Sequence, residues 1–216
     1  MTLAIEALDV AIGAVPIIRG ATLEVPAGKV CGLIGRNGAG KTTLMRAVMG
    51  VLPARSGAIR FEGRDITKVE AYGRARAGIG YMPEDRKLVP DFTVRDNILL
   101  PVWARGETAA PQRLQWIYEV MPELSRLADR HASQLSGGQQ KMVALARALM
   151  AGTRLLLLDE PSEGLAPALA QRMHEILAAL RGTGLSVLMA ESNDMNLSEL
   201  LDRVFVIERG SVVERG

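Results

Sequence analysis

The sequence predicts an α/β fold built on a parallel β-sheet that helices cover on both faces. Five short runs are apolar throughout and do not alternate with polar residues, which is typical of parallel strands buried on both faces. Segments with helical spacing of apolar residues separate several of these runs, and such alternation favours an α/β sheet. The five runs are Val30–Ile34, Ile79–Met82, Leu155–Leu158, Leu185–Ala190 and Val204–Ile207.

Length and composition limit the classes of protein to which the chain can belong. It has 216 residues, 48% of them hydrophobic, which is enough for one domain with a sizeable core and excludes a disordered or fibrous chain. The 26 basic residues nearly balance the 24 acidic ones, so the net charge of +2 gives no reason to expect a nucleic acid partner.

The cellular compartment follows from cysteine usage and from the apolar runs. The single cysteine, Cys31, cannot form an intramolecular disulfide, which indicates a reducing compartment. No apolar run approaches the ~18 residues that cross a bilayer. Acidic side chains also stand where a signal peptide would be basic and then apolar. We therefore expect a cytoplasmic chain that reaches a membrane only through a partner.

Short strands dominate the N-terminal part, and helices alternate with strands in the rest. The predicted N-terminal strands, separated by glycine and proline turns, are Leu3–Val10, Ala21–Val25 and Ala58–Phe61. A helix is expected over Thr42–Gly50, directly after the run Val30–Ile34 and its glycine-rich turn. Two further helices, each with apolar residues on one face, are expected over Gln139–Met150 and Ala168–Leu180.

Residues 85–133 break this alternation. Prolines end or kink helices, and this segment contains a helical patch over Leu114–Val120 among four of them. The prolines are Pro90, Pro101, Pro111 and Pro122. We therefore expect an inserted helical lobe here, with a linker-like stretch over residues 106–111.

One turn carries the first clear chemical pattern. It reads Gly35-Arg36-Asn37-Gly38-Ala39-Gly40-Lys41-Thr42, which matches the phosphate-binding pattern of glycine, four residues, Gly-Lys and Ser/Thr between a strand and a helix. Glycines let backbone N–H groups approach phosphate oxygens, and the helix N-terminus adds a positive dipole end. Lys41 supplies a charge for the β- and γ-phosphates, and the Thr42 hydroxyl is placed to bind Mg²⁺. The glycine order differs from that of a dinucleotide-binding turn.

A second pattern supplies carboxylates. Asp159 and Glu160 follow the buried run Leu155–Leu158 and so stand at the C-terminal edge of the sheet, where ligands bind in open α/β folds. We expect Asp159 to hold Mg²⁺ and Glu160 to polarise the attacking water as general base. Two acids after a strand can also simply open a turn, but the phosphate-binding turn upstream favours the catalytic interpretation.

A third motif, at the start of a predicted helix, reads Leu135-Ser136-Gly137-Gly138-Gln139-Gln140. Its serine and glycines form a second anion-binding helix N-terminus. The motif closely resembles the signature of ATP-binding cassette (ABC) proteins. The phosphate-binding turn, this motif and the two carboxylates follow one another in the order expected for that family, so the resemblance spans essentially the whole chain. It implies that two subunits pair head to tail, so that Ser136 and Gly138 of one face the γ-phosphate held by Lys41 of the other.

The resemblance also implies a fold and a set of site residues. The fold is a P-loop NTPase (RecA-like) parallel sheet with an N-terminal antiparallel β subdomain, in one ABC ATPase domain over residues 1–216. Its core takes residues 1–84 and 134–216, and its helical subdomain takes 85–133. The cofactors are ATP and Mg²⁺, with Thr42, Asp159 and Glu84 on the metal and Glu160, Lys41, Glu84 and Ser192 in catalysis. The residues expected to bind ATP are Gly35, Arg36, Asn37, Gly38, Ala39, Gly40, Lys41, Thr42, Thr43, Ser136, Gly137, Gly138 and Gln139.

Within the family, the chain is most similar to ATPase subunits of branched-chain amino-acid importers. The runs that carry this likeness are Met82-Pro-Glu-Asp-Arg86, Phe92-Thr-Val-Arg-Asp-Asn97, Met121-Pro-Glu-Leu124 and Asp159-Glu-Pro-Ser-Glu-Gly-Leu-Ala-Pro167. ATPases for urea and other solutes share much of them. The likeness implies a second ATPase subunit, identical or different, integral membrane permease subunits and, indirectly, a solute-binding protein. The chain would then lie on the inner face of the cell membrane.

In these importers the inserted lobe receives a helix of the membrane subunit in a groove. The resemblance therefore implies a transmission face over Glu84–Trp103. Its candidate contacts are Phe92, Val94, Ile98 and Trp103. The same four side chains can equally form the core of the lobe.

The chain departs from the general ABC pattern at four positions. Glu84 stands where most members have glutamine. Its carboxylate adds negative charge beside the phosphates, so assembly of the site should depend more on Mg²⁺. Ser192 stands where a histidine usually contacts the γ-phosphate and cannot become cationic, so catalysis should rely more on Glu160. Ile12 replaces the aromatic residue that stacks on adenine, and Ala166 replaces a loop aspartate. The branched-chain amino-acid subfamily has similar departures.

Two other classes of function stay open. A soluble ABC ATPase acting on DNA or ribosomes usually carries two cassettes or a long coiled coil, and a charge of +2 does not favour it. A P-loop kinase would need an acceptor site and has no use for the motif Leu135–Gln140. The family usually continues into another helix after the position of Gly216.

Overall fold

The protein structure is a computed structural model that describes residues 1–107, 110–193, 197 and 199–215. Gly216 and part of the stretch 106–111, expected to act as a linker, therefore lie outside the described residues. The strands are β1 (Leu3–Ile12), β2 (Val15–Val25), β3 (Val30–Ile34), β4 (Ala54–Phe61), β5 (Arg64–Asp65), β6 (Ile79–Met82), β7 (Leu155–Asp159), β8 (Ser186–Glu191), β9 (Arg203–Glu208) and β10 (Ser211–Arg215).

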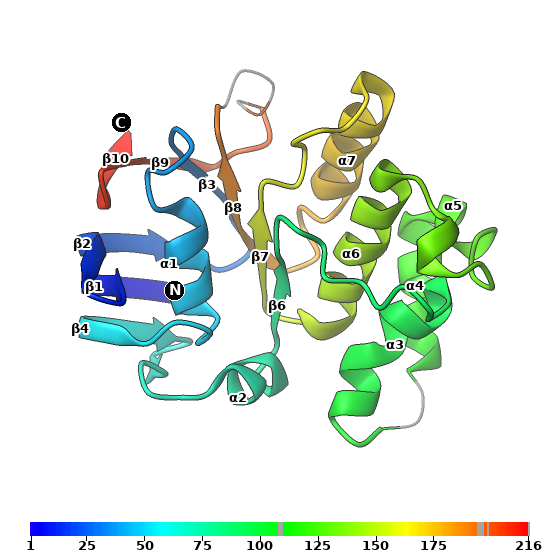
Figure 1. Ribbon diagram of the computed structural model, residues 1–216, viewed down its shortest axis with the longest axis horizontal. Helices are drawn as coiled ribbons and strands as arrows, with labels where there is room; N and C mark the ends of the chain where they lie inside the picture. Colours follow the sequence, from blue (N-terminus) through cyan, green and yellow to red (C-terminus); the bar gives the residue numbers. More distant parts are fainter. Residues whose placement is uncertain (108–109, 194–196, 198, 216) are drawn as a thin grey trace.

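Helices lie between the strands in the chain, and those after residue 90 gather on one side of the molecule (Figure 1). The helices are α1 (Lys41–Val48), α2 (Ala71–Arg76), α3 (Val94–Ala104), α4 (Pro111–Val120), α5 (Pro122–Ser125), the short 3₁₀ helix η1 (Ala132–Gln134), α6 (Gly137–Ala151) and α7 (Pro167–Ala179). Among the described helices, none has the length and apolar character needed to cross a membrane.

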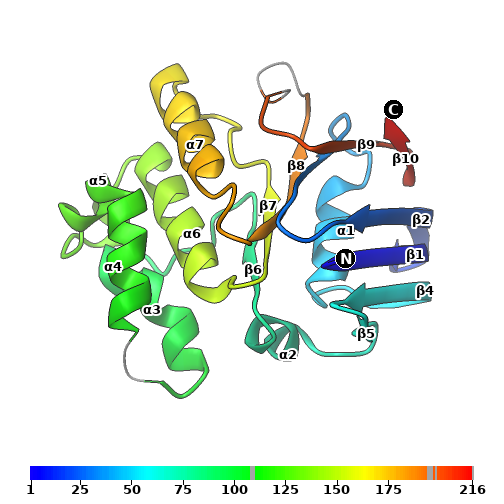
Figure 2. The same ribbon diagram turned by 180° about the vertical axis from the view of Figure 1, so that it is seen from behind.

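Two sheets organise the described residues. The larger has the strand order β10-β9-β3-β8-β7-β6, and the smaller, whose four strands are labelled in Figure 2, is antiparallel with the order β2-β1-β4-β5. The five runs predicted as parallel strands are β3, β6, β7, β8 and β9, and they are parallel to one another. The predicted α/β class is therefore confirmed, with the antiparallel sheet beside the parallel one.

The edge strand β10 was not predicted. It pairs antiparallel with β9 through the two-residue turn Arg209-Gly210, where both residues have positive φ, 47° and 83°. Such a turn matches the twist of a tight hairpin. A Cβ on Gly210 would also lie on the carbonyl oxygen of Ile17, so only glycine fits there.

Each face of the central sheet is covered by its own apolar core. One core joins α1 to the antiparallel sheet, with fully buried residues such as Leu8, Ile18 and Leu44. The other joins α6 and α7 to the helices of residues 94–125 on the opposite side of the sheet (Figure 2). Because the buried stripe of α6 belongs to this second core, α6 connects the lobe helices to the sheet. Burial of apolar area on this scale is the main force that holds the layers together.

Strand order brings three loops together at one edge of the sheet. The strand β3 lies between β8 and β9, and β7 pairs with β8 on its other side. In this register Ile34 is opposite Glu191, and Asp159 is opposite Ala190. The phosphate-binding turn after β3, the acids at the end of β7 and Ser192 after β8 therefore meet at the C-terminal edge, as expected for an open α/β sheet.

Candidate functional site

The phosphate-binding turn joins β3 to α1 and depends on two close approaches of glycine. A Cβ on Gly35 would lie 2.5 Å from the carbonyl oxygen of Ile207, and one on Gly40, with φ of 113°, would lie 2.8 Å from Ile18. The backbone N–H groups of the turn and of the start of α1 that have no acceptor among the described residues include those of Gly38, Gly40, Lys41, Thr42 and Thr43. The turn therefore presents a set of free donors that suits an anion.

Lys41 and Glu160 form a buried ion pair in this site. Their Nζ and Oε1 atoms are 2.9 Å apart, and the side chains are 3% and 7% exposed. The Lys41 ammonium also donates to the carbonyl oxygen of Gly35 at 2.6 Å. Burial opposes ionisation of Glu160, but hydrogen bonds from Glu163 and Lys41 outweigh it and lower the pKa of Glu160 below its usual value. The carboxylate is therefore ionised at neutral pH, as a general base must be.

Asp159 ends β7 and lies fully buried beside Thr42. Thr42 Oγ1 donates to one carboxylate oxygen at 3.2 Å, and the Tyr81 hydroxyl donates to the other at 3.4 Å. Burial, together with the charges of Glu84 and Glu160, raises the pKa of Asp159 to about 6. A cation at this point would offset the repulsion among these carboxylates.

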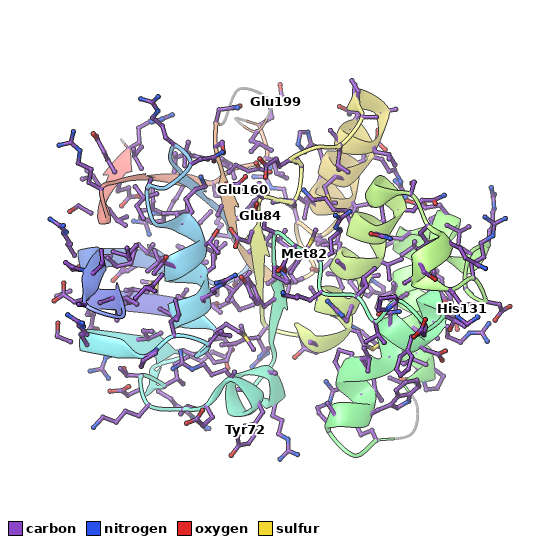
Figure 3. All side chains as sticks on the ribbon, viewed as in Figure 1. Tyr72, Met82, Glu84, His131, Glu160 and Glu199 are labelled. Atoms are coloured by element: carbon purple, nitrogen blue, oxygen red, sulfur yellow. The ribbon has the colours of Figure 1, made fainter. Side chains whose placement is uncertain are left out.

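Glu84 completes a set of hard oxygen donors. It lines the same cavity, of about 410 Å³, as Lys41, Thr42 and Glu160, and Figure 3 shows Glu84 and Glu160 close together near the ends of β6 and β7. Hydroxyl and carboxylate oxygens are the protein ligands that Mg²⁺ prefers, and Mg²⁺ commonly keeps several waters and substrate phosphates as its other ligands. The residues present therefore fit Mg²⁺.

Ser192 follows β8 and contacts both the phosphate-binding turn and the expected base. Its Oγ lies 2.9 Å from Asn37 Oδ1 and 3.4 Å from Glu160 Oε1. The serine hydroxyl has one proton, which it can donate to either oxygen. The structure thus places Ser192 in the site, although it is shorter than the histidine of the general pattern.

The signature motif lies outside this cavity, at the N-terminus of α6. Ser136 Oγ accepts from the Gln139 amide at 3.3 Å, and the Gln139 side chain accepts from the Ser136 amide at 3.0 Å, which forms a capping box. The amides of Gly137 and Gly138 have no acceptor among the described residues. The expected ATP-binding residues therefore form two groups within one chain, one in the cavity and one on α6.

Two isoleucines of the β1–β2 hairpin differ in how they lie relative to the cavity. Ile12 ends β1, is 51% exposed and does not line the cavity, whereas Ile17 of β2 does. Ile17 packs beside Gly40 of the phosphate-binding turn. Ile17 is a functional candidate that the sequence pattern missed.

A separate groove of about 590 Å³ lies between the core and the lobe. Its lining includes Met49, Ala75, Tyr81, Pro83, Lys87 and Pro101. Of the two alternatives for Val94 and Ile98, a partner contact or the core of the lobe, the structure shows the second, since both are fully buried there. Phe92 and Trp103 are partly exposed and contact each other edge to face, with ring centroids 6.2 Å apart.

Comparisons with known proteins agree with this geometry. The profile described as "ABC transporter" matches residues 18–163. The chain belongs to the ABC transporter family. It is 36% identical over 201 residues to the high-affinity branched-chain amino acid transport ATP-binding protein BraG of Pseudomonas aeruginosa. The aligned region covers 93% of this chain and 86% of that protein. It is 34% identical over 202 residues to the lipopolysaccharide export system ATP-binding protein LptB of Escherichia coli, with 93% and 84% covered.

Solved structures support the same assignment. The ADP conformation of MJ1267, an ATP-binding cassette of an ABC transporter, is 30% identical and superposes with a TM-score of 0.87 over 100% of this chain and 91% of that one. A dimeric bacterial ABC transporter cassette, MJ0796, has a TM-score of 0.86 over 99% of both chains but is 21% identical, so it supports the fold alone. This ABC chain is therefore an ATP-binding ATPase coupled to transport.

One residue of the ABC ATPase site was not singled out from its sequence. Lys141 lies in α6, five residues after Ser136, and is 6% exposed. Its ammonium donates to the carbonyl oxygen of Glu160 at 2.7 Å and also to that of Glu163. A lysine next to the apolar stripe of a buried helix is unusual, because lysine is seldom buried without a partner. That signal was present in the sequence.

Proposed function

We propose that this chain binds ATP at the phosphate-binding turn and hydrolyses it with Glu160 as general base. The free N–H donors of the turn and the Lys41 ammonium would hold the phosphates. Lys41 would move from its pair with Glu160 to the β- and γ-phosphates, which frees the carboxylate for the attacking water. The observation that carries the proposal is the ionised Glu160 carboxylate beside Lys41 in one cavity.

Mg²⁺ would be held by Thr42, Asp159 and Glu84. Bound there, it would neutralise charge on the phosphates during hydrolysis. One hydroxyl and two carboxylates leave the remaining octahedral positions to water and to the nucleotide, so the ion would bind together with ATP. Ser192 would orient Glu160 and the water through its hydroxyl.

The second group of ATP-binding residues would act on a partner subunit. Ser136, Gly137, Gly138 and Gln139 sit away from the cavity of their own chain, and two amides there lack an acceptor among the described residues. We infer a head-to-tail pair, homodimeric or heterodimeric, in which ATP bridges Lys41 of one subunit and the signature of the other. Closure on ATP and opening after hydrolysis would then move the partner.

The groove between the core and the lobe supports a permease contact on the cytoplasmic face of the membrane. Its lining is mainly apolar, and its charged residues are the acidic Asp85 and the basic Lys87, Arg46 and Arg147. Asp85 and Lys87 belong to the segment that resembles the transmission face, and residues 85–133 form the lobe in this proposal. A short amphipathic helix of an integral membrane subunit is the occupant that such a groove suits.

The proposed transport reaction is import of branched-chain amino acids. BraG supports it at 36% identity, and export of lipopolysaccharide is the competing function because LptB is 34% identical. Permease subunits encoded beside this gene, reconstituted in liposomes with the ATPase, would decide. ATP hydrolysis should rise with a leucine-loaded binding protein. A rise with lipopolysaccharide, and none with the amino acid, would assign the chain to export.

Glu160→Gln tests the ATPase proposal directly. The variant should bind ATP, lose at least about 10²-fold in kcat and accumulate as a closed pair with ATP. ATP binding is measured by calorimetry and pairing by size-exclusion chromatography. Normal turnover in this variant would refute Glu160 as the base. Phosphate transfer to a small molecule in place of water would instead indicate a kinase.

A further inference from the structure

Lys141 is a buried cation for which the proposed hydrolysis has no role. Among the described residues its ammonium makes no ion pair, and it donates to two backbone carbonyl groups. Burial lowers the pKa of Lys141, which means that the surroundings of the ammonium disfavour its charged form. A buried ammonium of this kind is costly, so its two contacts need an explanation.

Both contacts are made to the loop that begins with Glu160. The ammonium lies 2.7 Å from the Glu160 carbonyl oxygen and also binds the Glu163 carbonyl oxygen. The φ of Glu160 is 50°, in the left-handed region that a non-glycine residue rarely adopts. Such a conformation persists only where neighbouring groups hold it, and it is found most often at functional sites.

Two elements hold this backbone from opposite sides. The Glu160 amide donates to the Ala190 carbonyl oxygen of β8 at 2.9 Å, and the Glu160 carbonyl accepts from Lys141 of α6. Two residues further on, the Ser162 amide donates to Glu191 Oε1 at 3.0 Å. On the α6 side, Lys141 is the described side chain that fixes the carbonyl groups. The backbone of Glu160, the proposed base, is therefore bound to α6, the helix that begins at the signature motif.

The start of α6 also packs directly against the segment after this loop. A Cβ on Gly138 would lie 2.4 Å from Leu169 Cδ1 and 3.5 Å from Leu165 Cδ2. Figures 1 and 2 show α6 and α7 side by side next to β7. The signature and the base of one chain thus belong to one packed unit, joined by the Gly138 contact and by Lys141.

We propose that Lys141 is a positioning residue that holds the Glu160 carboxylate in its catalytic orientation by binding the backbone of residues 160 and 163. The proposal rests on Glu160 acting as the base. Lys141 touches neither the nucleotide nor the water in this scheme. Its loss therefore lowers kcat through a misplaced Glu160 and leaves ATP binding intact.

Two substitutions in the full chain test this role. Lys141→Met keeps the length of the side chain without its donors, and we expect a loss of the order of 10²-fold in kcat, as a misplaced catalytic group costs, with KM for ATP within about 2-fold. Lys141→Gln restores a neutral donor and should recover about 10-fold of that loss. Steady-state phosphate release measures both variants. If the methionine variant does not fold, Lys141→Gln carries the test through its own loss in kcat, about 10-fold relative to the wild type. Wild-type kcat in Lys141→Met, or KM rising while kcat holds, would overturn the proposal.

The Glu160→Gln variant, which lacks the base, can distinguish two roles of Lys141. One is to position the Glu160 carboxylate, and the other is only to stabilise α6. Lys141→Met added to Glu160→Gln should leave ATP-driven pairing on size-exclusion chromatography as it is in Glu160→Gln alone. Loss of that pairing would mean that Lys141 shapes the signature, and the proposal would be wrong. A matched control is Arg113→Met, which removes a partly buried cation that donates to the carbonyl oxygens of Leu149 and Gly152 at the far end of α6. It should lower Tm and leave kcat unchanged.

The two proposals fail in different ways. If Glu160→Gln turns over like the wild type, the base assignment is wrong and the role of Lys141 falls with it. If Glu160→Gln is inactive while Lys141→Met is normal, only the positioning role is wrong.

Discussion

The two groups of proposed site residues differ in how completely one chain surrounds them. At the cavity and directly beside it, Lys41, Asp159 and Glu160 are buried and bound to partners from the same chain. On α6, Ser136 and Gly137 are exposed, and their local contacts are a capping box and one bond from Arg86 to the Gly137 carbonyl oxygen. The first group is preorganised within a single fold, and the second presents a surface.

This difference indicates a division of work between binding and pairing. Buried, mutually bound groups keep their geometry before substrate arrives, at a cost in stability. Exposed groups with free N–H donors gain little until another surface meets them. Substitutions in the cavity should therefore change nucleotide affinity and fold stability, whereas substitutions in the signature should change assembly.

The largest effect is expected for Lys41→Ala. It removes the charge for the phosphates and leaves Glu160 as an unpaired buried carboxylate, and we expect ATP affinity to fall by about 10²–10³-fold, as the loss of one partner of a buried charge pair costs. Calorimetric titration with ATP measures it, with Lys68→Ala, at an exposed position, as control. Unchanged affinity would refute the role of the turn and remove the distinction between the two groups.

Asp159→Asn tests whether the cavity costs stability. The pKa of Asp159 is about 6 in the folded chain against 3.8 ordinarily, so the folded state binds the proton more tightly and stability falls as pH rises through this window. Above pH 6 the ionised group costs about 3 kcal/mol. Asn should therefore raise the free energy of unfolding by about that amount at pH 7.5, and by little at pH 4, in urea titrations without nucleotide.

The control for this prediction is Ser136→Ala in the signature. It removes the N-cap and should lower stability by about 1 kcal/mol at both pH values. If Asp159→Asn is destabilising at pH 7.5, burial of the carboxylate does not carry the cost that its raised pKa implies.

The sequence predicted the cavity better than the contacts between its parts. The run before Asp159 and the glycines before Lys41 are local patterns, and ligands bind at the C-terminal edge of a parallel sheet, so the meeting of the two motifs at that edge could be predicted. The contacts of Lys141 and Ile17 could not, because their partners at Glu160 and Gly40 lie 19 and 23 residues away in the chain and are defined by packing. The pattern of polar and apolar residues alone also could not show that Val94 and Ile98 are buried in the core of the lobe.

A smaller effect is expected for Gly138→Val, which probes the signature. The added side chain would overlap Leu169 and displace the N-terminus of α6, and overpacking of this kind costs about 1–3 kcal/mol, or roughly 10-fold or more in pairing. Affinity for ATP should stay within about 2-fold of the wild type. Pairing is measured in the Glu160→Gln background by analytical ultracentrifugation. Loss of ATP binding in this variant would mean that the two groups are not separable.

The smallest effect is expected for Ser192→Ala. Its Oγ is 3.4 Å from Glu160, a long hydrogen bond, so kcat should fall only about 3- to 5-fold, in line with about 1 kcal/mol for such a bond. Burial opposes the charge of Glu160, and the Ser192 contact is one of those that lower its pKa, so its removal should raise that pKa. The acid limb of the pH profile of kcat should therefore move to higher pH, while pairing stays unchanged.

Ser136→Ala is the matched variant for Ser192→Ala, because it places the same change in the other group. We expect it to weaken ATP-driven pairing by about 5-fold through loss of the N-cap, with the acid limb of kcat where it is in the wild type. A shift of that limb in Ser136→Ala, or weakened pairing in Ser192→Ala, would contradict the division. Each serine would then act on both functions, and the separation of base and signature within one chain would have to be replaced by a single coupled site.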